Sequence, residues 1–246
     1  MNFRLLLGLV AAMSAQPAAA ASPVLVVALH ARAIDRPALR RAIETVQAPA
    51  LKSWRSDGML TGYRLLFARY PDAGQWDTLE LLRFKDEAAL ARWRRTAGEP
   101  FAPRILALAQ SVETTVGNLT RAEGVPSHDP AVLVIPYETL VPPADYVAYL
   151  DGYTIPQFRG WMKAGVLDGY EIVTSSYPAG RPWSALITLR YKDDAALGRR
   201  DVVVQKTREA LSSDRSWKTL ADSKKNVRTE RVLAVADEVS AEGDVP

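Results

Sequence analysis

One nine-residue pattern occurs twice in the chain, as LRFKDEAAL at residues 82–90 and as LRYKDDAAL at residues 189–197. When the chain is aligned with itself at an offset of 107 residues, the agreement runs without a gap from Trp54 to Leu90. The coinciding residues include two tryptophan pairs, Trp54 with Trp161 and Trp76 with Trp183. A period of this length is too long for a solenoid and indicates two copies of a complete small fold.

Each copy predicts the same order of strands and helices. Residues 24–30 and 132–138 are short β-branched runs that are typical of buried strands. Residues 35–56 and 143–164 have the apolar spacing of a helix, with a bend expected at a proline that both copies share. Two strands are predicted next in each copy, at residues 60–70 and 76–84 and at residues 167–177 and 183–191.

The repeated nine residues join the second of these strands to another helix. Asp86 and Asp193 stand where an N-cap is expected, so the simplest role of this segment is capping and surface solvation. A last strand is predicted at 112–122 in the first copy and at 227–235 in the second. This alignment needs an offset of 115, so the second copy would carry 8 extra residues (115 − 107). The expected domains are residues 22–121 and 132–240, with a linker at 122–131.

The β-α-β-β-α-β order is that of the ferredoxin-like split βαβ unit, whose sheet leaves one face bare. Two copies in one chain can cover each other with these faces. With the repeated Gly-x-Leu-x-Gly-Tyr motif (58–63 and 165–170) and Arg-x-Lys-Asp motif (83–86 and 190–193), the chain resembles the dimeric α+β barrel superfamily. It is similar to a group of exported bacterial proteins within it, with the usual homodimer replaced by a tandem duplication. The expected fold is therefore an α+β intramolecular barrel, and the expected state is a monomer.

The first residues have the pattern of a secretory signal peptide. Arg4 precedes an apolar run at residues 5–13, and small residues follow at 18–21. This run is much shorter than the ~20 residues that a spanning helix needs. We expect cleavage after Ala20 or Ala21, a periplasmic or secreted bacterial protein, and no stable membrane anchor after cleavage.

Composition excludes several kinds of site. The chain has no cysteine, which rules out disulfides, thiolate metal sites and a cysteine nucleophile. Its net charge is only +3, and its basic residues are mixed with carboxylates, so no nucleic-acid partner is expected.

The resemblance implies a pocket between the helices and the sheet of each copy. The superfamily includes cofactor-independent monooxygenases, haem-degrading enzymes, dye-decolorising peroxidases, muconolactone isomerases and stress proteins, so the fold alone does not indicate the ligand. Haem needs an axial ligand, and the only histidines are His30 at a strand end and His128 in the predicted linker. No carboxylate cluster accompanies either histidine, so we expect no metal and no cofactor.

Glu80 is the sharpest difference between the copies, because Ile187 takes its place in the second. Alternation places Glu80 on one strand face with Trp76, Thr78, Leu82 and Phe84. If buried, this carboxyl would have a raised pKa, which suits a general acid or base. The alternative is a carboxylate in water or paired with an arginine. Glu80 and His30 are the candidate catalytic residues.

The aromatic and arginine residues are the other candidates. The residues that we expect to bind a ligand are Tyr63, Arg69, Trp76, Arg83, Tyr170, Trp183 and Arg190. Retention of most of them in both copies is also what a shared core requires. The first copy carries His30, Arg69 and Glu80 where the second has Glu138, Ser176 and Ile187, so we expect a polar ligand site in the first half.

These features favour an exported protein that binds a small apolar or aromatic molecule without a cofactor. The alternative is a cofactor-independent monooxygenase with Glu80 or His30 as its proton-transfer residue. A haem-handling enzyme is the third reading.

Overall fold

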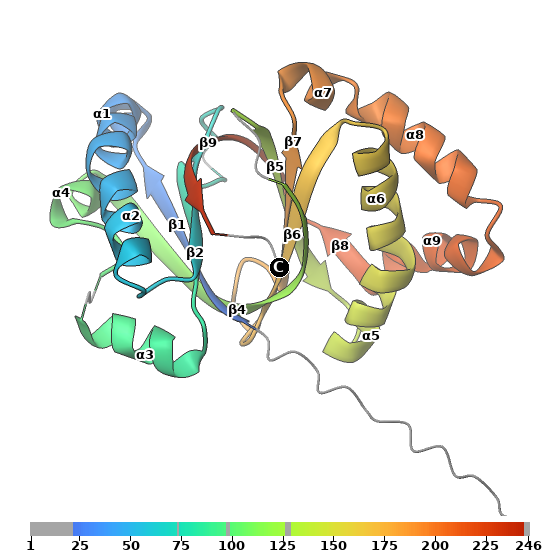
Figure 1. Ribbon diagram of the computed structural model, residues 1–246, viewed down its shortest axis with the longest axis horizontal. Helices are drawn as coiled ribbons and strands as arrows, with labels where there is room; N and C mark the ends of the chain where they lie inside the picture. Colours follow the sequence, from blue (N-terminus) through green and yellow to red (C-terminus); the bar gives the residue numbers. More distant parts are fainter. Residues whose placement is uncertain (1–21, 73, 97–98, 126–128, 244–246) are drawn as a thin grey trace, which may run out of the picture.

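The computed structural model describes residues 22–72, 74–96, 99–125 and 129–243 (Figure 1). The predicted signal peptide, residues 1–21, and His128 lie outside the described residues. Within the described ranges, no helix has both the length and the apolar character needed to cross a membrane.

The two halves contain corresponding elements. The strands of the first half are β1 (Ser22–Ala31), β2 (Gly62–Ala68), β3 (Thr78–Arg83) and β4 (Ala109–Gly124). Its helical segments are η1 (Ala33–Asp35), α1 (Arg36–Ala42), η2 (Ile43–Gln47), α2 (Ala48–Ser56), α3 (Glu87–Thr96) and α4 (Pro103–Leu106). The strands of the second half are β5 (Ala131–Thr139), β6 (Leu167–Ser175), β7 (Ala185–Tyr191), β8 (Arg228–Glu230) and β9 (Ala234–Glu242). Its helical segments are α5 (Pro143–Tyr149), η3 (Leu150–Thr154), α6 (Ile155–Lys163), α7 (Asp194–Gly198), α8 (Arg200–Leu211) and α9 (Arg215–Val227).

Eight strands of the described residues close into an antiparallel barrel in the order β7-β6-β4-β1-β3-β2-β9-β5, and β5 pairs back with β7. Each half contributes four strands. The halves are joined where β2 pairs with β9 and where β4 pairs with β6. Helices of the first half cover one outer side of the barrel and those of the second half cover the other (Figure 1). The predicted α+β architecture, two ferredoxin-like units in one intramolecular barrel, is confirmed.

Alternation along the strands divides the buried side chains into three apolar clusters. One lies between the sheet and the helices of the first half, and a second lies in the same position in the second half. The third cluster fills the inside of the barrel, with residues such as Val24, Leu81, Val134 and Val173 from both halves. The halves therefore bury each other's bare sheet faces.

The long first helix of each half contains a π-helical turn immediately before its proline. These turns, η2 and η3, precede Pro49 and Pro156, which lie at the start of α2 and α6. A proline inside a helix has no N–H and crowds the preceding turn, and a π-turn accommodates this locally. The bend predicted at the prolines is therefore a wider helical turn.

Glycines end the long first helices, and the predicted capping aspartates are confirmed. Gly58 and Gly165 follow the helices with φ of 71° and 70°, a conformation that favours glycine. Asp86 accepts from the backbone N–H of Ala89 at 2.7 Å, and Asp193 accepts from that of Ala196 at the same distance. Both aspartates therefore cap the helices that follow them.

The predicted last strand of the second half, residues 227–235, is present but interrupted, because β8 and β9 both pair with β5 and residues 231–233 lie between them. Helix α9 continues to Val227, and the barrel strand β9 begins only at Ala234. Val116 pairs opposite Leu25 and Val235 opposite Leu133, which sets the offset between the last strands at 119. The second half thus has 12 extra residues (119 − 107), not 8. The predicted linker 122–131 is also too long, because β4 extends to Gly124.

Candidate functional site

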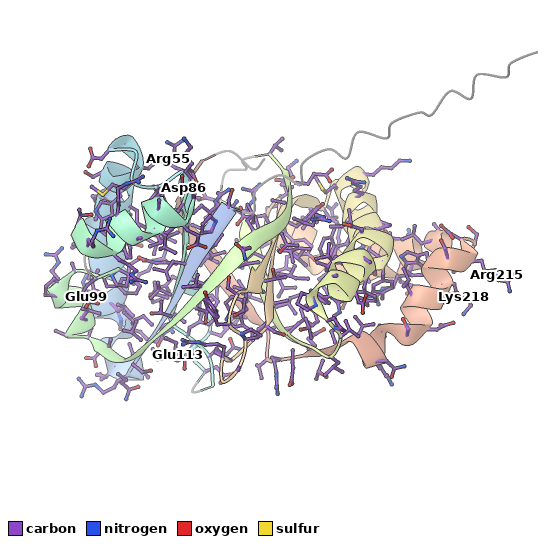
Figure 2. All side chains as sticks on the ribbon, turned by 90° about the horizontal axis from the view of Figure 1, so that it is seen from below. Arg55, Asp86, Glu99, Glu113, Arg215 and Lys218 are labelled. Atoms are coloured by element: carbon purple, nitrogen blue, oxygen red, sulfur yellow. The ribbon has the colours of Figure 1, made fainter. Side chains whose placement is uncertain are left out.

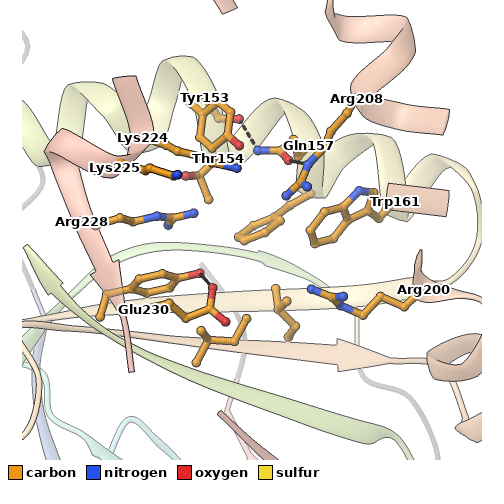
Figure 3. A pocket seen from close by; sticks show the side chains of 14 residues that line it. Tyr153, Thr154, Gln157, Trp161, Arg200, Arg208, Lys224, Lys225, Arg228 and Glu230 are labelled. Carbon is orange, nitrogen blue, oxygen red and sulfur yellow. Dashed lines mark hydrogen bonds between the residues drawn. The ribbon is translucent and has the colours of Figure 1, made fainter. Parts of the chain in front are cut away.

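A cavity of about 200 Å³ lies between the helices and the sheet of the second half. Strands β5 and β7 form its floor, and α6, α8, α9 and β8 supply most of its walls (Figure 3). Its charged lining residues are Arg200, Arg208, Lys224, Lys225, Arg228 and Glu230. Five cations and one carboxylate make this cavity strongly positive.

Arg228 is held in place by aromatic rings. Its guanidinium lies 4.0 Å from the ring centre of Tyr137 and 5.4 Å from that of Tyr149, both within cation–π distance. Arg228 is half-buried, but its Nη1 atom is buried and has no hydrogen-bond partner in the described part of the chain. The guanidinium is thus fixed while part of its donor capacity is unused.

Other donors that line the cavity are also unused. Nε of Arg200 and Nε1 of Trp161 are buried without a hydrogen-bond partner among the described residues. Both groups can only donate. Figure 3 shows the guanidinium groups of Arg200 and Arg228 pointing toward each other across the cavity. Buried donors normally find acceptors, so this arrangement fits an acceptor supplied by a ligand.

Hydrogen bonds hold several polar side chains of the cavity lining in place. Gln157 accepts from Nε of Arg208 at 2.8 Å and donates to the Tyr153 carbonyl at 3.0 Å. Glu230, the only carboxylate among the described lining residues, accepts from the Tyr137 hydroxyl at 3.4 Å. The aromatic surface of the cavity comes from Tyr137, Tyr153, Phe158 and Trp161.

A second cavity, of about 440 Å³, lies at one end of the barrel. Three of the predicted site residues, His30, Trp76 and Trp183, line it together. Trp76 was expected beside Glu80, but it packs against the apolar cluster inside the barrel. We refer to this second cavity as the barrel mouth.

The opposite end of the barrel holds a buried charge cluster, formed by Arg64, Arg83, Glu171, Arg190 and Glu238. Arg64 donates to Oε1 of Glu171 from Nη2 at 2.6 Å and from Nε at 2.9 Å, and it also binds Glu238. Nη2 of Arg83 lies 3.6 Å from the same oxygen of Glu171. Burial lowers the pKa of Arg190, and it donates to the Val125 carbonyl. The predicted ligand residues Arg83 and Arg190 thus lie together, within an internal ion-pair network.

The remaining predicted ligand residues lie apart from both cavities. Tyr63 is fully buried in the helix-side core and exchanges a hydrogen bond of 2.9 Å with the hydroxyl of Ser240. Tyr170 is buried in the corresponding core and donates to Glu123 at 3.2 Å. Arg69 binds Asp237 and Asp194 at the outer end of β2.

Glu80 is fully buried on the helix side of β3. Neither of its carboxylate oxygens has a hydrogen-bond partner in the described residues, because the nearby Gln47 amide donates to the Pro100 carbonyl. Burial raises the pKa of Glu80 well above its ordinary value, and the nearby Gln47 side chain offsets only part of this increase. Glu80 lines neither the second-half cavity nor the barrel mouth, so no opening there leads to this carboxyl.

Haem does not fit the second-half cavity. Its described lining residues include no histidine, cysteine or methionine, and its volume is below the ~300–1,000 Å³ of pockets for drug-sized ligands. Tyrosine can bind haem iron, but burial raises the pKa of Tyr137 and so disfavours the phenolate. Among the described residues, no group of three or more histidine, aspartate or glutamate side chains could hold a metal ion.

No family model and no curated protein match the chain. Several solved structures do match the chain. A candidate monooxygenase from Fusobacterium nucleatum subsp. nucleatum matches with a TM-score of 0.60 and 14% identity, and the match covers 92% of this chain and 97% of the monooxygenase chain. The chain has the dimeric α+β barrel fold. An anthrone oxidase-like protein matches with a TM-score of 0.56 and 11% identity, over 90% of this chain and 92% of the other. A chlorite dismutase variant from Candidatus Nitrospira defluvii matches with a TM-score of 0.52 and 8% identity, over 89% and 92%. Similarity at these identities establishes the fold alone.

The sequence did not indicate the residues of the second-half cavity. All five cations named above lie on α8, α9 and β8, in the segment where the second half is longer than the first. The signal in the sequence that could have indicated this site was the extra length of the second copy. We expected a polar site in the first half, whereas this charged cavity lies in the second.

Proposed function

We propose that the chain binds a small aromatic acid in the second-half cavity. One observation carries the proposal: five cationic side chains and one carboxylate line this cavity, and buried guanidinium and indole N–H groups there have no acceptor among the described residues. Clustered like charges repel, and donors that are buried without partners cost free energy. A ligand carboxylate removes both costs, and an arginine can bind it through two parallel hydrogen bonds.

The walls and the volume indicate the rest of the ligand. Tyr153, Phe158 and Trp161 offer ring surfaces against which an aromatic group can pack. A cavity of about 200 Å³ suits a single ring with its acid group. This proposal keeps the aromatic ligand expected from the sequence and adds a negative charge to it.

Calorimetric titration of the purified mature chain with benzoate and benzamide tests this. Benzamide has the same ring but no charge, so benzoate should bind at least tenfold more tightly, in line with the ~1.5–3 kcal/mol of a hydrogen bond to a charged group. The affinity for benzoate should fall as salt concentration rises.

Arg228→Met should reduce benzoate affinity by tenfold or more. Lys225→Gln tests the same cavity at an exposed position where folding is not at risk, and should weaken binding by a smaller factor. Arg215→Met is the matched control, because Arg215 lies on α9 at the outer end of the second half, away from the cavity (Figure 2). Equal binding of benzoate and benzamide, or equal losses in the Arg228 and Arg215 variants, would exclude the proposed site.

A cofactor-independent monooxygenase is the alternative function, and one observation favours it. His30 lines the barrel mouth, and its Nε2 has no hydrogen-bond partner among the described residues, so a base lies beside a cavity that can hold an aromatic substrate. One structural match is described as a candidate monooxygenase and another as anthrone oxidase-like. Oxygen uptake with anthrone that is lost in His30→Phe and retained in Glu80→Gln would support the enzyme. No uptake with the wild-type chain would count against it.

A further inference from the structure

The barrel mouth is formed by both halves and is separate from the second-half cavity. The first half supplies apolar walls from Val26, Ala28 and Leu79, and the second supplies them from Pro136, Trp183 and Leu186. Deeper in the barrel, larger side chains such as Leu66 and Leu81 fill the space. The small side chain of Ala28 helps to leave about 440 Å³ open at this end, within the range of small-molecule pockets.

Two tryptophans face this cavity from equivalent positions. Trp76 and Trp183 are related by the 107-residue offset of the repeat, and both pack against the apolar cluster inside the barrel. Trp183 is 7% exposed, and Trp76 is half-buried. Paired indole rings beside aliphatic walls favour a flat aromatic ligand.

His30 adds a hydrogen-bond acceptor to this apolar lining. Its Nδ1 lies 2.9 Å from the Gln75 carbonyl oxygen, which can only accept, so Nδ1 carries the proton. In the neutral ring, Nε2 is therefore the acceptor, and it has no hydrogen-bond partner in the described residues. Oε1 of Glu113 lies 4.0 Å from Nε2 and is itself an acceptor. A ligand hydroxyl can donate to Nε2.

The charges around the barrel mouth almost balance. Its lining includes Arg181, Arg231 and Glu113, and Arg231 forms an ion pair with Glu138 outside the cavity. This differs from the second-half cavity, with its excess of four positive charges. The barrel mouth therefore suits an uncharged ligand.

We infer that the barrel mouth is a second binding site, that it takes a neutral aromatic alcohol, and that His30 accepts the hydrogen bond of the alcohol hydroxyl. This inference is independent of the proposed aromatic acid, because it rests on different residues and a different charge.

Calorimetric titrations with 2-naphthol and 2-methoxynaphthalene test it. The two probes share the ring system, but only 2-naphthol can donate a hydrogen bond. We expect the wild-type chain to bind 2-naphthol about tenfold more tightly, as one net hydrogen bond predicts. In His30→Phe this preference should disappear while 2-methoxynaphthalene still binds. Equal binding of both probes by the wild-type chain, or an unchanged preference in the variant, would overturn the role of His30.

Two further variants locate the site. Trp76→Leu should weaken both probes by a similar factor, and the half-buried position of Trp76 keeps the risk to folding low. Arg228→Met should leave both affinities unchanged, although it should weaken benzoate. If Trp76→Leu leaves the affinities for both probes unchanged, or if Arg228→Met weakens the binding of 2-naphthol, the probes do not bind in the barrel mouth. The aromatic acid and the alcohol are thus tested separately.

Discussion

The buried charge cluster should contribute strongly to the stability of the folded chain, and Glu171 is the residue at which this can be tested. This side chain is 2% exposed and binds Arg64 through two nitrogens. Burial alone would raise the pKa of Glu171, but the charges of Arg64 and Arg83 outweigh it and hold the pKa at about 2, below the ordinary value of 4.5. Each pKa unit corresponds to about 1.4 kcal/mol, so this difference stabilises the folded chain by about 3 kcal/mol at neutral pH.

We expect Glu171→Gln to lower the free energy of unfolding by about 3–5 kcal/mol at pH 7, because it removes a carboxylate that balances the charges of the buried arginines. The sign of the pH dependence follows from the lowered pKa. The stabilisation is present above pH 4.5 and is lost as the pH falls from 4.5 toward 2. The difference between wild type and variant should therefore shrink at pH 3.

Urea denaturation followed by tryptophan fluorescence at pH 7, 5 and 3 measures this difference. Asp222→Asn is the control, because it breaks an ion pair with Lys218 in which both side chains are more than half exposed. Such pairs contribute about 0–1 kcal/mol. A loss below about 1 kcal/mol in Glu171→Gln, or a loss of equal size at pH 7 and pH 3, would refute the reasoning from the buried network.

Four further outcomes are expected. Burial raises the pKa of Glu80, so the folded chain loses stability relative to the unfolded chain as the pH rises above 4.5. Glu80→Gln should therefore increase the urea midpoint at pH 7 and leave it unchanged at pH 4. Gly117→Ala should lower the melting temperature, because a Cβ there would lie 2.5 Å from the Thr174 carbonyl oxygen where β4 pairs with β6. Sedimentation of the mature chain should give a monomer, since each half already covers the sheet face of the other. N-terminal sequencing of the exported chain should begin at Ala21 or Ser22.

The fold could be predicted from the sequence because its main signals are local and occur twice. The strand runs, the helix-ending Gly58 and Gly165 and the capping Asp86 and Asp193 each lie within one element, and the ungapped repeat confirms their order. The last strand could not be placed in this way. The stretch after Lys225 does form strand, as its composition predicts, but residues 231–233 interrupt it, and the first half has no such interruption that the repeat could have shown.

The sites were less predictable because their residues come from distant segments. His30, Trp76 and Trp183 were identified as candidates, but only barrel closure shows that they share a cavity. Lys224 and Lys225 were not among the candidates, because two adjacent lysines carry no motif that indicates a site. Only the packing of α8 and α9 over the sheet brings such residues to the same cavity as Arg228.

The buried charge cluster also shows what the tandem duplication makes possible. Arg64 and Glu171 occupy equivalent positions of the repeat, 107 residues apart, yet they bind each other across the barrel. In a symmetric dimer, a residue at such a self-contacting position meets its own copy, so a buried arginine would face an arginine and a glutamate would face a glutamate. Joining the copies in one chain removes this constraint and lets the position carry opposite charges. Arg83 and Arg190 remain identical in the two halves, and the second half supplies the carboxylates, Glu171 and Glu238, that bind Arg64. The two halves are therefore complementary in charge and cannot be exchanged for each other.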